Sequence, residues 1–86
     1  MFELSFDNQP IQFLEGLPPD INRRIFNKIV KSKEDPLHYF GRLSGHSGYR
    51  MKVGQYRVVA DLDFASKKIR VSLIGHRKNV YDNLSS

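Results

Sequence analysis

The segment from residue 49 to residue 63 constrains the fold most, because its strand alternation is interrupted only once, at Gly54-Gln55. Apolar side chains occupy every second position on both sides of the interruption: Tyr49, Met51 and Val53 before it, and Tyr56, Val58, Ala60 and Leu62 after it. A two-residue connection that begins with Gly is typical of a type II′ turn. The pattern therefore predicts a β-hairpin in which Lys52 lies directly opposite Arg57, with Arg50 nearby.

The predicted hairpin carries positive charges on neighbouring strands. Like charges directly opposite each other destabilise a sheet by roughly a few tenths of a kcal/mol, and an anion bound across Lys52 and Arg57 would remove this conflict. Arg77, Lys78 and Tyr81 follow the next predicted strand and can close over the same face. A solvated face, with Lys and Arg present for solubility and edge protection, is the alternative interpretation.

Before the hairpin, the pattern predicts a strand and two helices. Alternating apolar residues indicate a strand over residues 2–6. Asp7 or Asn8 can cap a first helix, which has Pro10 in its first turn and ends near Gly16. Its inward side chains are expected to be Ile11 and Leu14, with Phe13 and Leu17 beside them.

A longer helix is predicted to start at Pro18-Pro19-Asp20 and to end at Glu34-Asp35-Pro36. Its apolar residues form one stripe, which indicates a core face: Ile21, Ile25, Phe26, Ile29 and Val30. The connector that follows is expected to contain a short strand at residues 39–43.

After the hairpin, alternation at residues 69–73 predicts a further strand that Gly75 breaks, and residues 79–84 suit a short terminal helix or an extended tail. The element order is therefore β-α-α-β-β-β within a single domain, residues 1–86. This is an α+β fold, in which two N-terminal helices pack on a small, twisted, mainly antiparallel sheet and leave its other face basic.

Charge is distributed unevenly along the chain. Residues 1–41 hold 5 Lys and Arg against 6 Asp and Glu, whereas residues 42–78 hold 9 against 2. A basic half of this kind favours a polyanionic partner, with nucleic acid ahead of an acidic protein. The chain has no Cys, which excludes disulfides and thiol catalysis, and no apolar run of membrane-spanning length. We expect a cytoplasmic protein without a membrane partner.

Motifs for most enzyme classes are missing, including Ser-His-Asp sets, phosphate-binding Gly loops, zinc spacings and dinucleotide fingerprints. We therefore expect no metal and no cofactor. The chemistry left open is metal-independent RNA cleavage, in which the 2′-hydroxyl attacks the neighbouring phosphate. Guanidinium groups stabilise the charge that develops, so Arg57 is expected to hold the scissile phosphate and Arg77 to stabilise the transition state or the leaving 5′ oxygen.

The proton-transfer group stays open among three residues. Repulsion from neighbouring arginines would favour the neutral amine of Lys52. Tyr81 can transfer a proton or stack on a base. His76 is the third candidate because imidazole side chains commonly act as general acids and bases, although its alternation with Ile74 suits a structural role equally well.

The segments YRMKVGQYRVVADLD and IRVSLIGHRKNVYD together resemble the C-terminal half of the RelE/ParE toxin superfamily, nearer to its RelE branch. The resemblance implies a toxin of a type II toxin-antitoxin system that cleaves mRNA in the ribosomal A site. It also implies a cognate acidic antitoxin, with operator DNA contacted only through the antitoxin complex. The implied catalytic residues are Lys52, Arg57, Arg77 and Tyr81, with Arg50, His76 and Lys78 binding RNA.

Two positions depart from the family pattern. Ala60 stands where many members carry an aromatic residue, and one of the two basic hairpin positions is Arg rather than Lys. Two other functions stay open: a ParE-like module that poisons gyrase by binding alone, and a degenerate member that binds only its antitoxin and operator DNA.

Overall fold

The computed structural model describes residues 1–45 and 47–84, and the side chains among them up to residue 82. The elements along the chain are β1 (Glu3–Phe6), α1 (Asn8–Glu15), α2 (Pro19–Lys31), α3 (Pro36–Tyr39), β2 (Gly41–Arg42), β3 (Tyr49–Val53), β4 (Tyr56–Asp63), β5 (Lys68–His76) and the 3₁₀ helix η1 (Val80–Leu84). Within this part of the chain, no helix is both long and apolar enough to cross a membrane.

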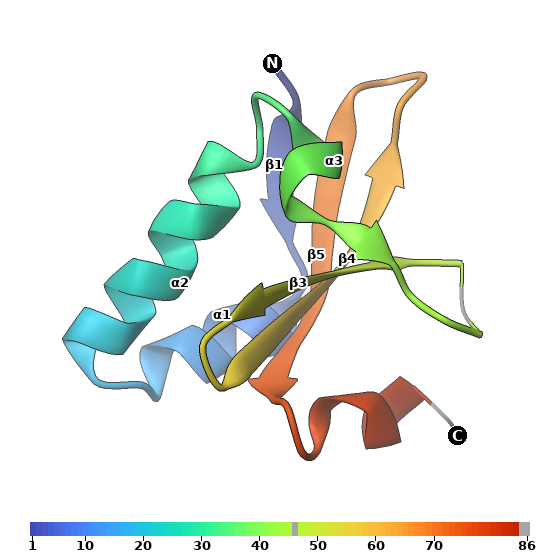
Figure 1. Ribbon diagram of the computed structural model, residues 1–86. Coiled ribbons are helices and arrows are strands. Elements are labelled where there is room, and N and C mark those ends of the chain that lie inside the picture. The colour runs from blue at the N-terminus through green and yellow to red at the C-terminus, as the bar shows by residue number, and fades with distance from the viewer. Residues whose placement is uncertain (46, 85–86) are drawn as a thin grey trace.

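The strands form one five-stranded sheet in the order β1-β5-β4-β3-β2 (Figure 1). The pair of β1 and β5 is parallel, and the other neighbours are antiparallel. The predicted α+β fold with a mainly antiparallel sheet is thus confirmed. Because β5 lies between β1 and β4, the last strand of the chain joins the first strand to the hairpin.

The β3–β4 hairpin has the predicted register, with Lys52 opposite Arg57 and Arg50 opposite Val59. Gly54 has a φ of 57°, and the one non-glycine residue with positive φ in the described chain is Lys67. Gln55 therefore has negative φ, which is the combination of a type II′ turn. The turn sets which side chains of β3 and β4 share a face.

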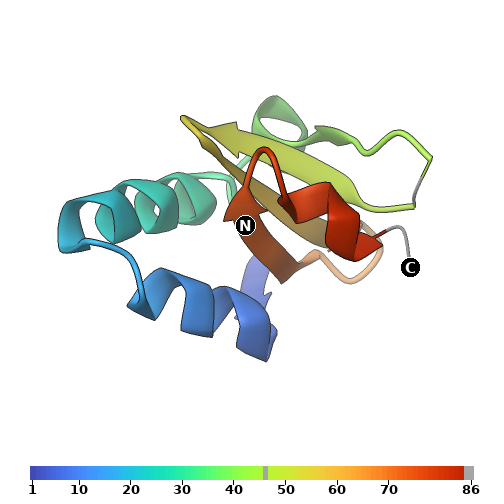
Figure 2. The same ribbon diagram turned by 90° about the horizontal axis from the view of Figure 1, so that it is seen from below.

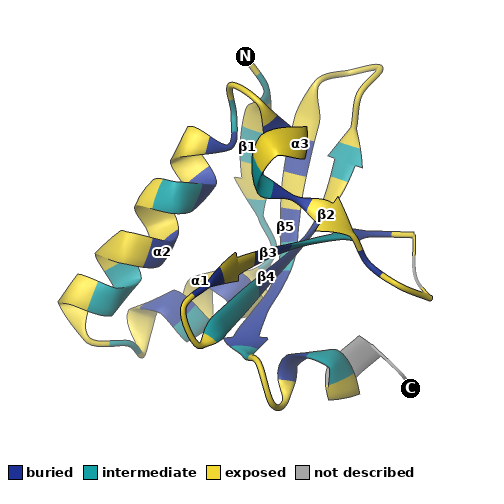
Figure 3. Ribbon diagram, viewed as in Figure 1, coloured by how far each residue is buried: buried dark blue, intermediate teal, exposed yellow. Residues whose placement is uncertain are grey.

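Helices α1 and α2 lie to one side of the strands, and η1 lies away from them (Figure 2). Ile25 and Ile29 of α2 are fully buried against apolar side chains from the central strands, including Met51, Val58 and Ile69. The buried positions gather on these strands and on the inner side of α2 (Figure 3). The sheet therefore has one face that is covered by helices and forms the main core.

Three predicted core positions are wrong. Ile11, Phe26 and Val30 are exposed by 44%, 42% and 39%. In α2, positions four apart face the sheet, whereas Phe26 and Val30 follow Ile25 and Ile29 by one residue and are turned by about 100°. Phe26 instead stacks on the ring of Phe6 at 6.0 Å, at the border of the core.

The connector after α2 also differs from its prediction. Helix α2 ends at Lys31, and the buried Ser32 hydroxyl donates to the Ile29 carbonyl at 2.5 Å. The expected strand over residues 39–43 is shorter, because Pro36 begins a helical turn that runs to Tyr39 before β2 starts. Proline suits the first helical position, since its φ is already helical and its missing N–H has no partner there.

The face of the sheet opposite α1 and α2 had been predicted to be basic, but only part of it is. A second apolar cluster covers part of it, with η1 on top: Leu43, Val59, Leu73 and Val80, with Tyr81 packed against them. An irregularity shifts the register of β4 and β5 between Val59, which pairs with Leu73, and Ala60, which pairs with Val71. The remaining part of this face bears Arg50, Lys52 and Arg57 and is called the basic face below.

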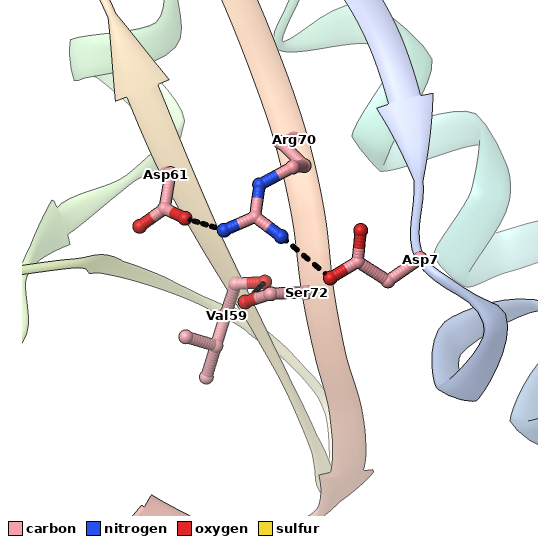
Figure 4. Close-up of polar contacts among 5 residues, drawn as sticks. All are labelled: Asp7, Val59, Asp61, Arg70 and Ser72. Atoms are coloured by element: carbon pink, nitrogen blue, oxygen red, sulfur yellow. Dashed lines mark hydrogen bonds and ion pairs between the residues drawn. The ribbon is translucent and has the colours of Figure 1, made fainter.

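Arg70 lies on β5 at the end of the sheet remote from the hairpin turn and contacts two carboxylates (Figure 4). Its Nη1 donates to Asp7 Oδ2 at 2.6 Å, and its Nη2 donates to Asp61 Oδ2. The carboxylates of Asp61 and Asp7 raise the pKa of Arg70. Asp7 was predicted as a helix cap, but its side chain makes no capping bond to α1. The positive charge of Arg70 is therefore neutralised by these two carboxylates.

Asp63 lies at the end of β4 and stabilises the turn between β4 and β5 in a way that depends on pH. Its Oδ1 accepts from the Ser66 N–H at 3.1 Å, and the hydrogen bonds from Ser66 lower the pKa of the Asp63 carboxyl. A lowered folded-state pKa adds stability above the unfolded pKa of about 3.9, and this contribution is lost as pH falls through the folded value. We expect urea unfolding to show Asp63→Asn as less stable than the parent at pH 6, with the difference narrowing toward pH 3. A difference that does not change with pH would contradict this assignment.

Candidate functional site

The basic face is built by the alternation of β3 and β4. Met51 and Val58 face each other across the hairpin and are buried under the helices. Their neighbours Lys52 and Arg57 form the next cross-strand pair and therefore project from the opposite face. Directly opposed residues have Cα atoms about 4.5–5.5 Å apart, so the two charges are close.

Arg57 is half-buried, and the hairpin turn holds its guanidinium group. Its Nη1 donates to the carbonyls of Gly54 at 3.0 Å and Tyr56 at 2.8 Å. No hydrogen bond joins its Nε or Nη2 to another residue in the described chain. A guanidinium has five N–H donors, so Arg57 has a fixed position and keeps donors for an anion.

Arg77 follows β5 and is attached to the same turn. Its backbone N–H donates to the Gln55 carbonyl at 2.8 Å. Its side chain is exposed, as is that of Lys78, whose N–H donates to His76 Nδ1 at 3.2 Å. The backbone thus brings Arg77 beside the turn that carries Arg57, although the two are 20 residues apart in the sequence.

Tyr81 lies in η1 and is half-buried against the second apolar cluster. Val80 anchors η1 over Gly75, where an added Cβ would lie 3.0 Å from the Val80 Cβ. Gly75 is the β5 partner of Arg57. The absence of a side chain at Gly75 therefore lets η1 approach the sheet directly beside Arg57. Gly75 was predicted to break this strand, which is wrong, because β5 continues through Gly75 to His76. The packing of Val80 over Gly75 was not predicted.

His76 is the one predicted site residue that lies apart from this group. It alternates with the buried Ile74, and its ring contacts Tyr56 at a centroid distance of 6.0 Å. Tyr56 belongs to the helix-covered face of the hairpin. The structure therefore brings Arg50, Lys52 and Arg57 onto one face, with Arg77 and Tyr81 at its border, and separates the His76 ring from them.

The ion pairs between described residues are those of Arg70 with Asp7 and Asp61. Arg50, Lys52, Arg57 and Arg77 thus have no described carboxylate partner. Among the same residues, no group of three or more His, Cys, Asp or Glu side chains is arranged to hold a metal ion. The chemistry that this arrangement can perform is binding of an anion and stabilisation of developing negative charge.

Gly75→Ala tests whether η1 must sit close to Arg57. The added methyl group would meet the Cβ, Cγ2 and Cα of Val80 at 3.0–3.3 Å and push η1 away from the sheet. We expect a loss of about 1–3 kcal/mol in the free energy of unfolding from overpacking, measured by urea unfolding. Gly41→Ala is the matched control, because an added Cβ at Gly41 meets nothing within 4 Å. Equal stability of the two variants would contradict the role given to Gly75.

Comparison with solved structures identifies the fold. The chain superposes on the RelBE2 toxin-antitoxin complex of Mycobacterium tuberculosis with a TM-score of 0.79 and 19% identity, over 88% of this chain and 98% of the other. It superposes on isolated Escherichia coli RelE with a TM-score of 0.75 and 22% identity, over 98% and 95%. For the RelB-RelE complex of Methanococcus jannaschii the values are 0.68 and 24%, over 92% and 96%.

Sequence comparison found no relative: no protein-family profile matches the chain, and no curated protein matches its sequence significantly. At identities below 25%, the property shared with the solved structures is the fold. The resemblance had been inferred from the segments YRMKVGQYRVVADLD and IRVSLIGHRKNVYD, which form the β3–β4 hairpin and the region from β5 to η1. The chain has the fold of the RelE toxins.

Proposed function

We propose that this chain is the toxin of a type II toxin-antitoxin pair and that it cleaves mRNA in the ribosomal A site without a metal ion. The observation that carries the proposal is the unneutralised pair of Lys52 and Arg57 on the basic face, with Arg77 attached to the same turn. The fold supports the toxin class, since the matched structures are RelE toxins and RelE-RelB complexes.

In the proposed reaction, the 2′-hydroxyl of the RNA attacks its own 3′ phosphate and the 5′ oxygen of the next nucleotide leaves. Arg57 holds the phosphate through the donors that the turn leaves free, and Arg77 stabilises the charge on the leaving oxygen. Lys52 or Tyr81 moves the proton, and Arg50 and Lys78 bind flanking phosphates. The side chain of His76 has no part in this proposal, because its ring packs on Tyr56.

The proposed need for the ribosome comes from the resemblance to the RelE branch, and the open basic face supports it. The basic face is part of an open sheet, and its cations bind phosphates without fixing the angle of the 2′-hydroxyl. An mRNA held in the A site would arrive already ordered. We further propose that an acidic antitoxin segment covers the basic face when the toxin is silent and that operator DNA is bound only through this complex.

The test is a cell-free translation reaction with the purified protein, followed by primer extension to map new 5′ ends on the mRNA. We expect cuts at A-site positions. We expect these cuts to be absent when ribosomes are omitted and when Arg57→Ala replaces the parent protein. Intact mRNA with normal protein synthesis would overturn the proposal. A gyrase supercoiling assay would then examine the ParE-like alternative.

A further inference from the structure

A second cationic site lies on the opposite side of the hairpin from the basic face. A pocket of about 460 Å³ separates α2 from the turn between β3 and β4, which lie beside each other in Figure 1. Its walls are formed by Arg24, Asn27, Lys28, Lys31, Tyr39, Val53 and Gly54. None of the candidate site residues on the basic face lines it.

Three cations from one side of α2 enter the pocket. Arg24, Lys28 and Lys31 are separated by four and then three residues, so they lie one above another along the helix. Like charges at this spacing destabilise a helix. No carboxylate lines the pocket, and the ion pairs of the described residues all involve Arg70. The repulsion among the three cations is therefore not relieved by a described acidic side chain.

The hairpin holds two of these cations in place. The Lys28 ammonium group donates to the Lys52 carbonyl at 2.6 Å. The Arg24 guanidinium lies against Gly54, where an added Cβ would fall well inside van der Waals contact with Nη2. Gly54, required by the turn for its positive φ, thus also makes room for Arg24. These two cations are therefore held in place by contacts with the hairpin, whereas the side chains in a run of solvated lysines are not.

We propose that this pocket is a second RNA-binding site, which takes a backbone phosphate of single-stranded RNA between Arg24, Lys28 and Lys31. Guanidinium and ammonium groups are the side chains that bind phosphate most strongly. The pocket volume suits one nucleotide, and Tyr39 supplies an aromatic wall on which a base can stack. An acidic peptide would need buried apolar anchors, and besides Tyr39 the only apolar side chain that lines the pocket is Val53.

The inference goes beyond the proposed function, because the pocket binds without cutting. The choice of RNA over DNA as the ligand rests on the proposed function. The inference that the three cations bind a backbone phosphate does not rest on it. The pocket and the basic face lie on opposite sides of one turn, and Lys28 is bonded to the backbone of Lys52. A strand that passes around Gly54-Gln55 contacts both sites.

The experiment measures binding of a short fluorescent RNA with 2′-O-methyl groups, which has no 2′-hydroxyl for cleavage, over a range of salt concentrations. We expect Arg24→Gln and Lys31→Gln each to weaken binding about 3- to 10-fold at low salt and to reduce the slope of log K against log salt by about 1. The matched control is Arg23→Gln, which removes the same charge from an exposed position of α2 outside the pocket. Both pocket residues chosen are exposed, and circular dichroism verifies folding of each variant.

Equal effects of Arg23→Gln and Arg24→Gln on affinity and slope would overturn the site and leave only general electrostatic attraction. Unchanged RNA binding, with weaker binding of polyglutamate by the pocket variants, would overturn the choice of RNA in favour of an acidic peptide. The translation assay separates the two proposals. If the parent protein makes no mRNA cuts but the pocket variants reduce the slope of log K against log salt, only the proposed function is overturned. If the parent protein cuts mRNA but the pocket variants leave this slope unchanged, only the pocket proposal is overturned.

Discussion

Arg57→Ala is expected to lower mRNA cleavage on the ribosome by about 100- to 1,000-fold, the usual cost of removing one preorganised donor from a developing negative charge. The loss should be large because the turn carbonyls of Gly54 and Tyr56 hold the guanidinium before RNA binds. The measurement is the rate of new 5′ ends under single-turnover conditions. Arg57→Lys keeps the charge without the fork of donors, so its rate should fall between those of the parent and Arg57→Ala.

Arg42→Ala is the matched control for Arg57→Ala. Arg42 is exposed on β2 of the same sheet, and its guanidinium lies 5.5 Å from the ring of Tyr49, which belongs to the helix-covered face. We expect nearly full cleavage by Arg42→Ala, and urea unfolding should show that Arg57→Ala stays folded. A folded Arg57→Ala that cuts at the parental rate would remove Arg57 from the reaction.

Ile29→Ala is expected to have the largest effect on stability. Ile29 is fully buried between α2 and the sheet, and truncation of such a side chain costs about 2–5 kcal/mol through lost burial and the cavity left behind. A chain of 86 residues has a total stability of about 4–13 kcal/mol, from roughly 0.05–0.15 kcal/mol per residue. The variant should therefore lose a large fraction of the total stability, which circular dichroism would detect as a lower urea midpoint.

Val30→Ala is the control for this change, because Val30 is the next residue of the same helix and is 39% exposed. Substitutions at such surface positions are usually within about 0.5 kcal/mol of the parent. The two variants therefore separate the buried side of α2 from its exposed side. Similar losses in both would mean that the predicted apolar stripe, and not the observed inner side alone, is buried.

Local rules were sufficient for the hairpin. The two-residue turn at Gly54-Gln55 admits one register, so the pairing of Lys52 with Arg57 could be predicted from the sequence and is confirmed. The starts of α1 and α2 followed from prolines near their first turns. The apolar stripe of α2 was predicted too wide, because periodicity identifies a helix side only to within about one residue position.

Contacts between distant segments could not be predicted in the same way. The parallel pairing of β1 with β5 and the bond between Asp7 and Arg70 join residues 63 or more apart. The terminal segment was expected as a helix or tail, and only packing shows that Val80 fits over Gly75. Such pairings depend on which surfaces meet after the chain closes long loops, and composition does not encode this locally.

The hairpin, its register and the order of the helices could be predicted from residue spacing. The concentration of positive charge in the second half could be counted along the sequence. Three contacts could be seen only in the folded chain. The Gln55 carbonyl holds Arg77 at the turn, the His76 ring faces Tyr56, and Arg24 reaches Gly54. The physical reason is that a site is assembled where separate elements meet, and the place of meeting is set by packing of the whole core.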